Sequence, residues 1–279
     1  MEDWKIECGW EKMNPDERVQ YLEKQGTFDV DIFDDPPTLP LNKMDYLRKR
    51  CTKKFKTLIA NMLAKKYIEK CIKKGELRIK EIQGIENWAN VDTGAIITCN
   101  HFSPFDNFAV QKAFERVQKK GQKMWKVIRE GNYTNPPCLK FFFQNCDTFP
   151  LSSNIHVMGD FLKAVKTVLN RGDFVLIYPE ESLWPNYKKP KPLKDGAYSF
   201  AVKHNVPVVP IFITLEDSGV VDKNGQSIQD YTLHICPPIY AKENLNKKEN
   251  VEYMKQTNYQ LWKQIYEDTY GKKLEYMTK

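Results

Sequence analysis

The sequence predicts an α/β fold, in which a mostly parallel sheet is covered by helices on both faces and is preceded by an N-terminal basic amphipathic helical segment. From Gly94 onward, short apolar runs alternate with amphipathic stretches, as expected when strands are buried on both sides and helices connect them. The 279 residues, of which 41% are hydrophobic, can bury one large core of this kind.

Charge divides the chain into three parts. Residues 1–42 carry 11 acidic and four basic side chains and end in a proline-rich run, 34–40, that predicts a stiff linker. The following stretch, 43–81, carries 14 basic and four acidic side chains. We therefore expect an acidic extension over 1–42, a basic helical segment over 43–80 and an α/β domain over 81–279.

The basic stretch has apolar residues at helical steps of three and four, with lysines and arginines between them. No proline or glycine interrupts it before Gly75, so one long helix, or two with a small break, is predicted over 43–74. Three interpretations stay open. The apolar stripe could enter an anionic membrane surface, it could pack on the protein's own sheet, or the charges could bind nucleic acid phosphates.

Each remaining element is predicted from its local pattern. A short helix is expected from Pro15 to Lys24, because Pro15-Asp16-Glu17 is a typical helix start. Strands are predicted at Ala95–Cys99, Met124–Ile128, Asp147–Leu151, Phe174–Tyr178, Val208–Thr214 and Tyr231–Cys236. Helices are predicted at Asp106–Lys119, Pro137–Gln144, Ile155–Asn170, Gly196–His204 and Lys248–Tyr270.

Several classes of protein are excluded by composition. The seven cysteines form no C-x-x-C pair and the four histidines lie far apart, which disfavours a disulfide framework and a metal site and favours a reducing cytosol. No apolar run approaches the ~18 residues of a membrane-spanning helix. The acidic, interrupted start does not have the pattern of a signal peptide. A soluble or peripheral protein is expected.

The first candidate site follows the strand Ala95–Cys99. Asn100 and His101 leave the strand, and Asp106 follows at the start of the next helix. An aspartate bonded to one ring nitrogen fixes the tautomer of the imidazole and makes the other nitrogen a better base. The pair predicts a general base for a hydroxyl or an amine; alternatively, Asp106 only caps the helix.

Two further runs begin or end strands. Tyr178-Pro179-Glu180 closes the strand Phe174–Tyr178, and a carboxylate there could bind acceptor hydroxyls or could be an exposed loop acid. Val206-Pro207-Val208-Val209-Pro210 reads as a buried strand that begins at Pro207, because proline is tolerated at the start or the edge of a sheet.

These motifs, in this order, resemble the lysophospholipid (glycerophosphate) acyltransferase family, typified by 1-acyl-sn-glycerol-3-phosphate acyltransferase. Asn100, His101 and Asp106 match N-H-x-x-x-x-D, and Tyr178-Pro179-Glu180 matches part of F-P-E-G-T-R. Lys194 and Gly196 match K-x-G-A, and Val206–Pro210 matches V-P-(I/V)-V-P, with Pro207 as its first proline. The resemblance covers about residues 83–239.

The resemblance implies acyl transfer from the thioester of acyl-CoA or acyl-carrier protein to a lysophospholipid or glycerolipid acceptor, in phospholipid biosynthesis. His101 would take the acceptor proton, Asp106 would orient His101, and Glu180, Ser153, Lys194 and Gly196 would lie at the acceptor. Asn100, Pro179 and Pro207 would support the motifs. No metal and no cofactor are required. An enzyme of lipids must reach the bilayer, so a cytoplasmic protein, peripheral at the inner face of an anionic membrane, is expected.

Two departures from the family bear on the acceptor. The arginine of the second motif is replaced by Ser153 and that of the third by Leu183. Such arginines suit phosphate because a guanidinium binds it through two hydrogen bonds. Lys188, Lys189, Lys191 and Lys194 could compensate or could be merely solvated. A non-phosphate or amine acceptor (N-acylation) and a catalytically silent lipid-binding relative are the alternatives; nucleic acid binding has little support from the modest charge of the body.

Overall fold

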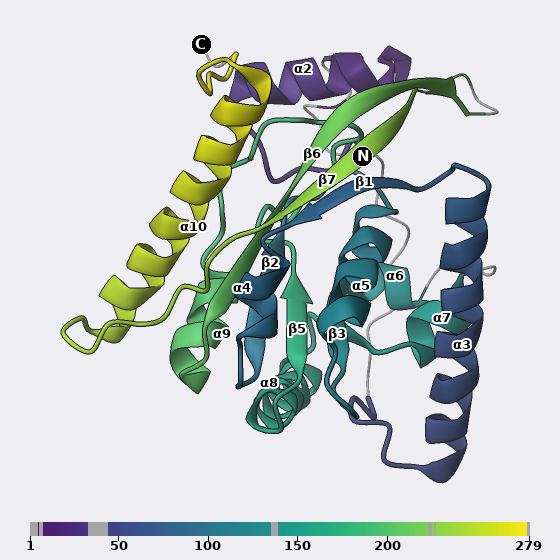
Figure 1. Cartoon of the computed structure of the whole chain (residues 1–279), viewed down its shortest axis with the longest axis vertical. Helices are drawn as coiled ribbons and strands as arrows, with labels where there is room; N and C mark the ends of the chain where they lie inside the picture. Colours follow the sequence, from purple (N-terminus) through teal and green to yellow (C-terminus); the bar gives the residue numbers. More distant parts are fainter. Residues whose placement is uncertain are drawn as a thin grey trace.

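A seven-stranded sheet forms the centre of the protein (Figure 1). The computed structural model describes residues 5, 8–32, 44–134, 139–222, 225 and 227–277; the proline-rich linker expected at 34–40 lies outside them. The strand order is β1-β7-β6-β2-β5-β3-β4. The strands are β1 (Arg78–Gln83), β2 (Ala95–Cys99), β3 (Met124–Arg129), β4 (Thr148–Leu151), β5 (Phe174–Ile177), β6 (Val208–Val221) and β7 (Ser227–Ile235).

The sheet is mostly parallel, as predicted. β6, β2, β5, β3 and β4 are parallel neighbours, whereas β7 runs antiparallel to β6. β6 continues well past Thr214, where its predicted end lay, because its second half pairs with β7 in a hairpin. β1 was not predicted; its polar sequence pairs in parallel with distant residues, Ile79 lying opposite Tyr231.

Helices cover both faces of the sheet, which confirms that prediction. On one face, Ile97 of β2 shares an apolar cluster with Trp88 of α4 (Ile85–Ala89) and Phe114 of α5 (Asp106–Val117). On the other face, Ile96 shares a cluster with Phe161 of α8 (Ile155–Asn170). That second cluster also includes residues of α9 (Gly196–His204) and α10 (Lys247–Tyr270). Alternate residues of one strand thus bury into two separate cores.

The basic helix α3 spans Cys51–Lys73 and begins later than predicted. Residues 44–50 are not helical, and Arg48 has a left-handed backbone with φ of 54°. Its buried guanidinium donates hydrogen bonds to the carbonyl oxygens of Cys146 and Thr148 at the start of β4. A non-glycine residue in this conformation interrupts a helix, so α3 starts only after it.

Much of the apolar stripe of this helix is exposed. Its buried residues are Thr57, Ala60, Ile68 and Cys71, whereas Phe55 and Leu58 are 63% and 69% exposed and Met62 is 49% exposed. The apolar stripe therefore does not pack on the sheet. α3 lies beside α7 (Lys140–Asn145) at one end of the molecule (Figure 1). Among the described residues, no helix is both long enough and apolar enough to cross a membrane.

The acidic N-terminal residues pack on the loop that follows β5. A short 3-10 helix, η1 (Trp10–Lys12), precedes α2 (Pro15–Gln25), whose start is stabilised by a capping box between Asn14 and Glu17. Trp10, Leu22 and Ile32 form an apolar cluster with Trp184 of the loop. This loop connects β5 with α9 and lies next to the candidate site. A further short helix, α6 (Glu130–Thr134), follows β3 directly.

Candidate active site

The loop after β2 brings His101 and Asp106 together. β2 is buried along its whole length and ends at Cys99, and Asp106 is the first residue of α5. The His101 Nδ1 atom lies 2.7 Å from Oδ2 of Asp106. The imidazole is 24% exposed, while the carboxylate is fully buried. Among the described residues, the other ring nitrogen has no hydrogen-bond partner, so the ring can accept a proton there.

The Asp106 carboxylate is held firmly in place. Its Oδ2 atom also accepts hydrogen bonds from the backbone N–H groups of Phe102 and Ser103, both at 3.2 Å. These groups belong to the same turn as His101, so the turn that presents the imidazole also fixes its carboxylate partner. Asp106 does not act only as a helix cap, because its side chain bonds the imidazole as well as the backbone.

Tyr178 is a third member of this cluster that the sequence analysis did not single out. It directly follows β5, and its ring stacks on the imidazole of His101 with centroids 4.1 Å apart. Its hydroxyl donates a 2.8 Å hydrogen bond to Oδ1 of Asp106. Burial, reinforced by the Asp106 charge, raises the pKa of Tyr178 well above its usual value, so the hydroxyl remains a donor. The signal in the sequence was that Tyr178 stands where the family motif F-P-E-G-T-R has phenylalanine.

Glu180 was expected at the acceptor, but its carboxylate is buried. The side chain is 2% exposed, and its Oε2 atom accepts a 3.0 Å hydrogen bond from the backbone N–H of His101. Its Oε1 atom accepts a 2.9 Å bond from the backbone N–H of Lys191, and the ammonium of that lysine lies 3.3 Å from Oε2. The carboxylate is therefore enclosed by the chain, where it holds the backbone of His101.

The four lysines considered as phosphate ligands are used in other ways. Lys191 is fully buried, burial lowers its pKa, and it donates to Oγ and the carbonyl oxygen of Ser182. Lys189 pairs with Glu23 of α2 at 2.6 Å, and Lys194 pairs with Asp29 at 2.8 Å. The acidic N-terminal residues thus neutralise two of these lysines. Lys188 lies over the ring of Tyr270.

The structure brings an arginine, not predicted, to the same edge of the sheet. Ser153, at the position of a family arginine, donates a 3.2 Å hydrogen bond to the buried carboxylate of Glu130. Arg129 precedes Glu130 and is the last residue of β3. Its guanidinium donates hydrogen bonds to Asp31 and to the carbonyl oxygen of Glu181. Because β3, β5 and β2 are parallel, Arg129 emerges at the edge where Tyr178 and His101 lie.

The remaining predicted residues have supporting positions. Asn100 is buried and bridges β2 to β6 through both its amide atoms, which bond the backbone N–H and carbonyl of Ile213. The backbone N–H of Lys194 donates to the carbonyl oxygen of Pro179, and Gly196 begins α9. The carbonyl oxygen of Pro207 accepts from the N–H of Ile96, just before β6 begins. These contacts fix the strand ends around His101.

No cluster of three or more His, Cys, Asp or Glu side chains that could hold a metal occurs within the described ranges. The site thus consists of a histidine, a buried aspartate and a tyrosine at the carboxyl ends of parallel strands. A histidine held by a buried carboxylate is an arrangement typical of general bases, and it lies here at the edge of the sheet where α/β proteins bind their ligands.

Comparison with known proteins relates this site to a family. Residues 79–214 match the model of the Acyltransferase family, and this range contains His101, Asp106 and Tyr178. The matched range contains the motifs found in the sequence, so the resemblance to acyltransferases is confirmed.

Two relatives illustrate the similarity. The chain is 27% identical over 168 residues to a chloroplastic 1-acyl-sn-glycerol-3-phosphate acyltransferase, BAT2, of Brassica napus. The match covers 58% of this chain and 46% of that protein, so the chain aligns with less than half of its curated relative. A crystal structure of the 1-acyl-sn-glycerophosphate (LPA) acyltransferase PlsC of Thermotoga maritima superimposes with a TM-score of 0.44 and 18% identity. That superposition covers 77% of this chain and 85% of the other.

Proposed function

We propose that this protein transfers a fatty acyl group from a thioester, acyl-CoA or acyl-carrier protein, to a lysophospholipid or glycerolipid hydroxyl. The observation that carries the proposal is the 2.7 Å contact between His101 Nδ1 and Asp106 Oδ2 in a chain that matches the model of the Acyltransferase family. No metal and no cofactor take part in the proposed reaction.

The free ring nitrogen of His101 removes the proton of the acceptor hydroxyl, and the oxygen attacks the thioester carbonyl. Asp106 stabilises the imidazolium that forms. The tetrahedral intermediate then collapses, the carbon–sulfur bond breaks, and the imidazolium returns its proton to the departing thiolate. The products are an ester and a free thiol, and the enzyme ends in its starting protonation state.

The acceptor carries the most specific part of the proposal. Serine and leucine occupy the two expected arginine positions, and three of the four downstream lysines form ion pairs. Arg129 lies at this edge and pairs with Asp31; a guanidinium can bind a phosphate through two hydrogen bonds, and a phosphate there would take the place of that carboxylate. We therefore keep a phosphate-bearing acceptor as the first candidate and a non-phosphate or amine acceptor as the second, favoured by the two lost arginines.

We also propose that the protein acts as a peripheral protein at the cytoplasmic face of an anionic membrane. Large apolar side chains of α3 are exposed among its lysines: Phe55, Leu58, Met62 and Tyr67. Exposed apolar groups next to cations suit a surface of anionic lipids, since the apolar groups enter the interface and the lysines meet the headgroups. This arrangement supports the partner expected from the sequence, an anionic membrane surface.

The test is an assay of purified protein with acyl-CoA and acyl-carrier protein against lysophosphatidate, other lysolipids, glycerol 3-phosphate and amines. We expect turnover with at least one lipid acceptor, and its loss by about 10³-fold or more in His101→Ala and Asp106→Asn, with melting of the His101 variant unchanged. An active His101→Ala variant would contradict the mechanism. Complete inactivity of the natural protein towards every donor and acceptor would favour the silent relative.

A further inference from the structure

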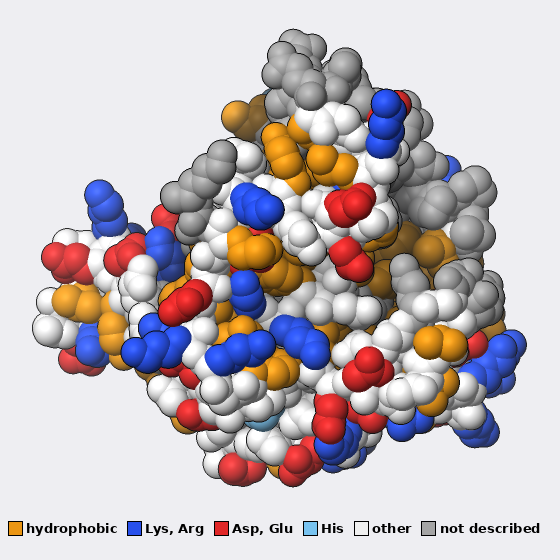
Figure 2. Space-filling view, turned by 90° about the horizontal axis from the view of Figure 1, so that it is seen from above, with side chains coloured by type: hydrophobic (Ala, Val, Ile, Leu, Met, Phe, Trp, Pro, Cys, Tyr) orange, Lys and Arg blue, Asp and Glu red, His pale blue; other side chains and the backbone are white. Residues whose placement is uncertain are grey.

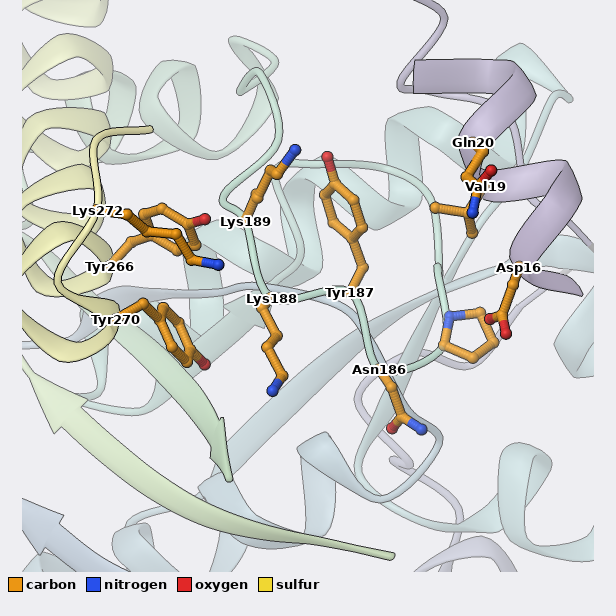
Figure 3. A pocket seen from close by; sticks show the side chains of 11 residues that line it. Asp16, Val19, Gln20, Asn186, Tyr187, Lys188, Lys189, Tyr266, Tyr270 and Lys272 are labelled. Atoms are coloured by element: carbon orange, nitrogen blue, oxygen red, sulfur yellow. The ribbon is translucent and has the colours of Figure 1, made fainter. Parts of the chain in front are cut away.

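A cavity of about 450 Å³ lies between the N-terminal helix α2, the loop that follows β5 and the C-terminal end of α10. Figure 3 shows it as two walls on either side of the loop. Tyr266, Tyr270 and Lys272 come from the side of α10, and Val19 and Gln20 come from α2. The volume is within the range of small-molecule sites, about 300–1,000 Å³.

The charge of the cavity is positive. Neither Lys188 nor Lys272 forms an ion pair with any described residue, and both are exposed. Lys189 also lines the cavity but is neutralised by Glu23. The acid in the lining is the exposed Asp16, on the wall opposite Lys272. Figure 2 looks onto the end of the molecule where α2 and the C-terminus lie, and shows basic, acidic and hydrophobic side chains interspersed across it.

The wall formed by α10 presents aromatic rings in fixed orientations. The rings of Tyr266 and Tyr270 have centroids 5.0 Å apart, and the ammonium of Lys188 lies 5.5 Å from the centroid of Tyr270. The hydroxyl of Tyr270 accepts from the backbone N–H of Leu215 at 2.8 Å and donates to its carbonyl oxygen, which anchors the ring. Tyr266 is buried and Tyr270 is half-buried, so the anchored ring of Tyr270 is the one that can meet a planar base, and nearby ammonium groups can pair with its phosphates.

The same loop connects this cavity to the candidate active site. Asn186 lines the cavity, and its backbone N–H donates a 3.1 Å hydrogen bond to the carbonyl oxygen of Phe102, the residue after His101. Two residues earlier, the N–H of Trp184 donates to the carbonyl oxygen of His101. The loop that lines the cavity is therefore bonded directly to the turn that carries the imidazole.

We propose that this cavity binds the phosphorylated adenosine end of coenzyme A, with Lys188 and Lys272 at the phosphates and the ring of Tyr270 beside the adenine. The flexible pantetheine arm would then cross the loop to place the thioester at His101. The proposal rests on the proposed acyl transfer and makes it more specific. It selects acyl-CoA as the donor, because the phosphopantetheine of a carrier protein lacks the adenosine.

Direct binding tests the site without any turnover. We would titrate the protein with adenosine 3′,5′-bisphosphate, CoA and 3′-dephospho-CoA. We expect binding of the bisphosphate and of CoA, weaker binding of 3′-dephospho-CoA, and a loss of about tenfold or more in affinity for CoA in Lys188→Ala/Lys272→Ala. The matched control, Lys247→Ala/Lys248→Ala, removes two exposed lysines at the other end of α10 and should bind as the natural protein does.

The outcomes separate this inference from the proposed function. Failure of the natural protein to bind the bisphosphate, or equal affinities in the natural protein and the Lys188/Lys272 variant, would overturn the site even if acyl transfer is observed. A protein that binds the bisphosphate through these lysines but transfers no acyl group would retain the site and refute the activity. With acyl-CoA as donor, the variant should raise KM and leave kcat unchanged, whereas acyl-pantetheine should show no difference.

Discussion

The Tyr178 hydroxyl donates a 2.8 Å hydrogen bond to Oδ1 of Asp106, while the same side chain stacks on the imidazole that Asp106 holds. Both oxygens of the Asp106 carboxylate are therefore hydrogen-bonded. His101 and two backbone N–H groups contact Oδ2, and the tyrosine contacts Oδ1. Tyr178 does not bond His101 directly through its hydroxyl; it positions the base through the carboxylate and through its ring.

Tyr178→Phe should lower kcat by about tenfold and leave KM unchanged. The variant keeps the stacked ring but loses one hydrogen bond to a charged group, which is worth about 1.5 kcal/mol at the low end. Steady-state kinetics with the best acceptor measure the effect. Tyr178→Leu also removes the stacking and should cost more. The exposed Tyr240 supplies a control, Tyr240→Phe; a Tyr178→Phe enzyme with the kcat of this control would refute the positioning role.

Lys191→Met should lower the free energy of unfolding by about 3–5 kcal/mol, because it leaves the buried Glu180 carboxylate without its cation. Urea unfolding measures the change. Adding Glu180→Gln to the variant should recover part of the loss, since the uncompensated charge is gone. Lys194→Met breaks an ion pair in which both side chains are 47% exposed, so it should cost at most about 1 kcal/mol. Equal effects at the two lysines would contradict the structural role of Lys191.

Exposed apolar residues of α3 should govern binding to lipid vesicles. Replacing Phe55, Leu58 and Met62 with serine should weaken binding to anionic vesicles by about tenfold or more. Much of the apolar surface of these side chains is exposed and so available to the membrane interface. Co-sedimentation with vesicles measures this. The natural protein should detach at high salt, where the lysines are screened. As a control, Ile155→Ser and Val221→Ser remove exposed apolar groups elsewhere; a loss of binding equal to that of the α3 variant would locate the membrane contact outside α3.

The stability of the protein should fall as the pH drops below about 6.5, partly because of His234. Burial lowers the pKa of this histidine, an effect that Glu81 opposes, and its Nε2 atom lies 2.9 Å from the hydroxyl of Thr214. The unfolded chain therefore takes up a proton at a pH where the folded chain does not, and the free energy of unfolding declines with acid.

His234→Gln should flatten this dependence below about pH 6.5, as measured by urea unfolding at several pH values. Part of the slope should persist, because burial, with Lys203 and Lys166, also lowers the pKa of His204. An unchanged slope in His234→Gln would show that His234 does not contribute.

Local sequence patterns were sufficient to predict much of the α/β domain and the pairing of His101 with Asp106. β2, α8 and α9 have the predicted limits, because continuous apolar runs and helical periodicity are properties of neighbouring residues. The separation of His101 and Asp106 by five residues is also local, since one turn and a helix start suffice to bring them together. The family could be recognised because its motifs are short and keep their order.

Tertiary structure alone decided the surroundings of that pair. β1 exists because β7 offers it a partner far along the chain. α3 starts only after Arg48, whose side chain bonds the start of β4. Glu180 was expected at the acceptor but lies buried against Lys191 and the backbone of His101. A sequence shows which residues can ionise or bond. Burial and partners depend on contacts between distant segments, and these contacts form only when the chain folds.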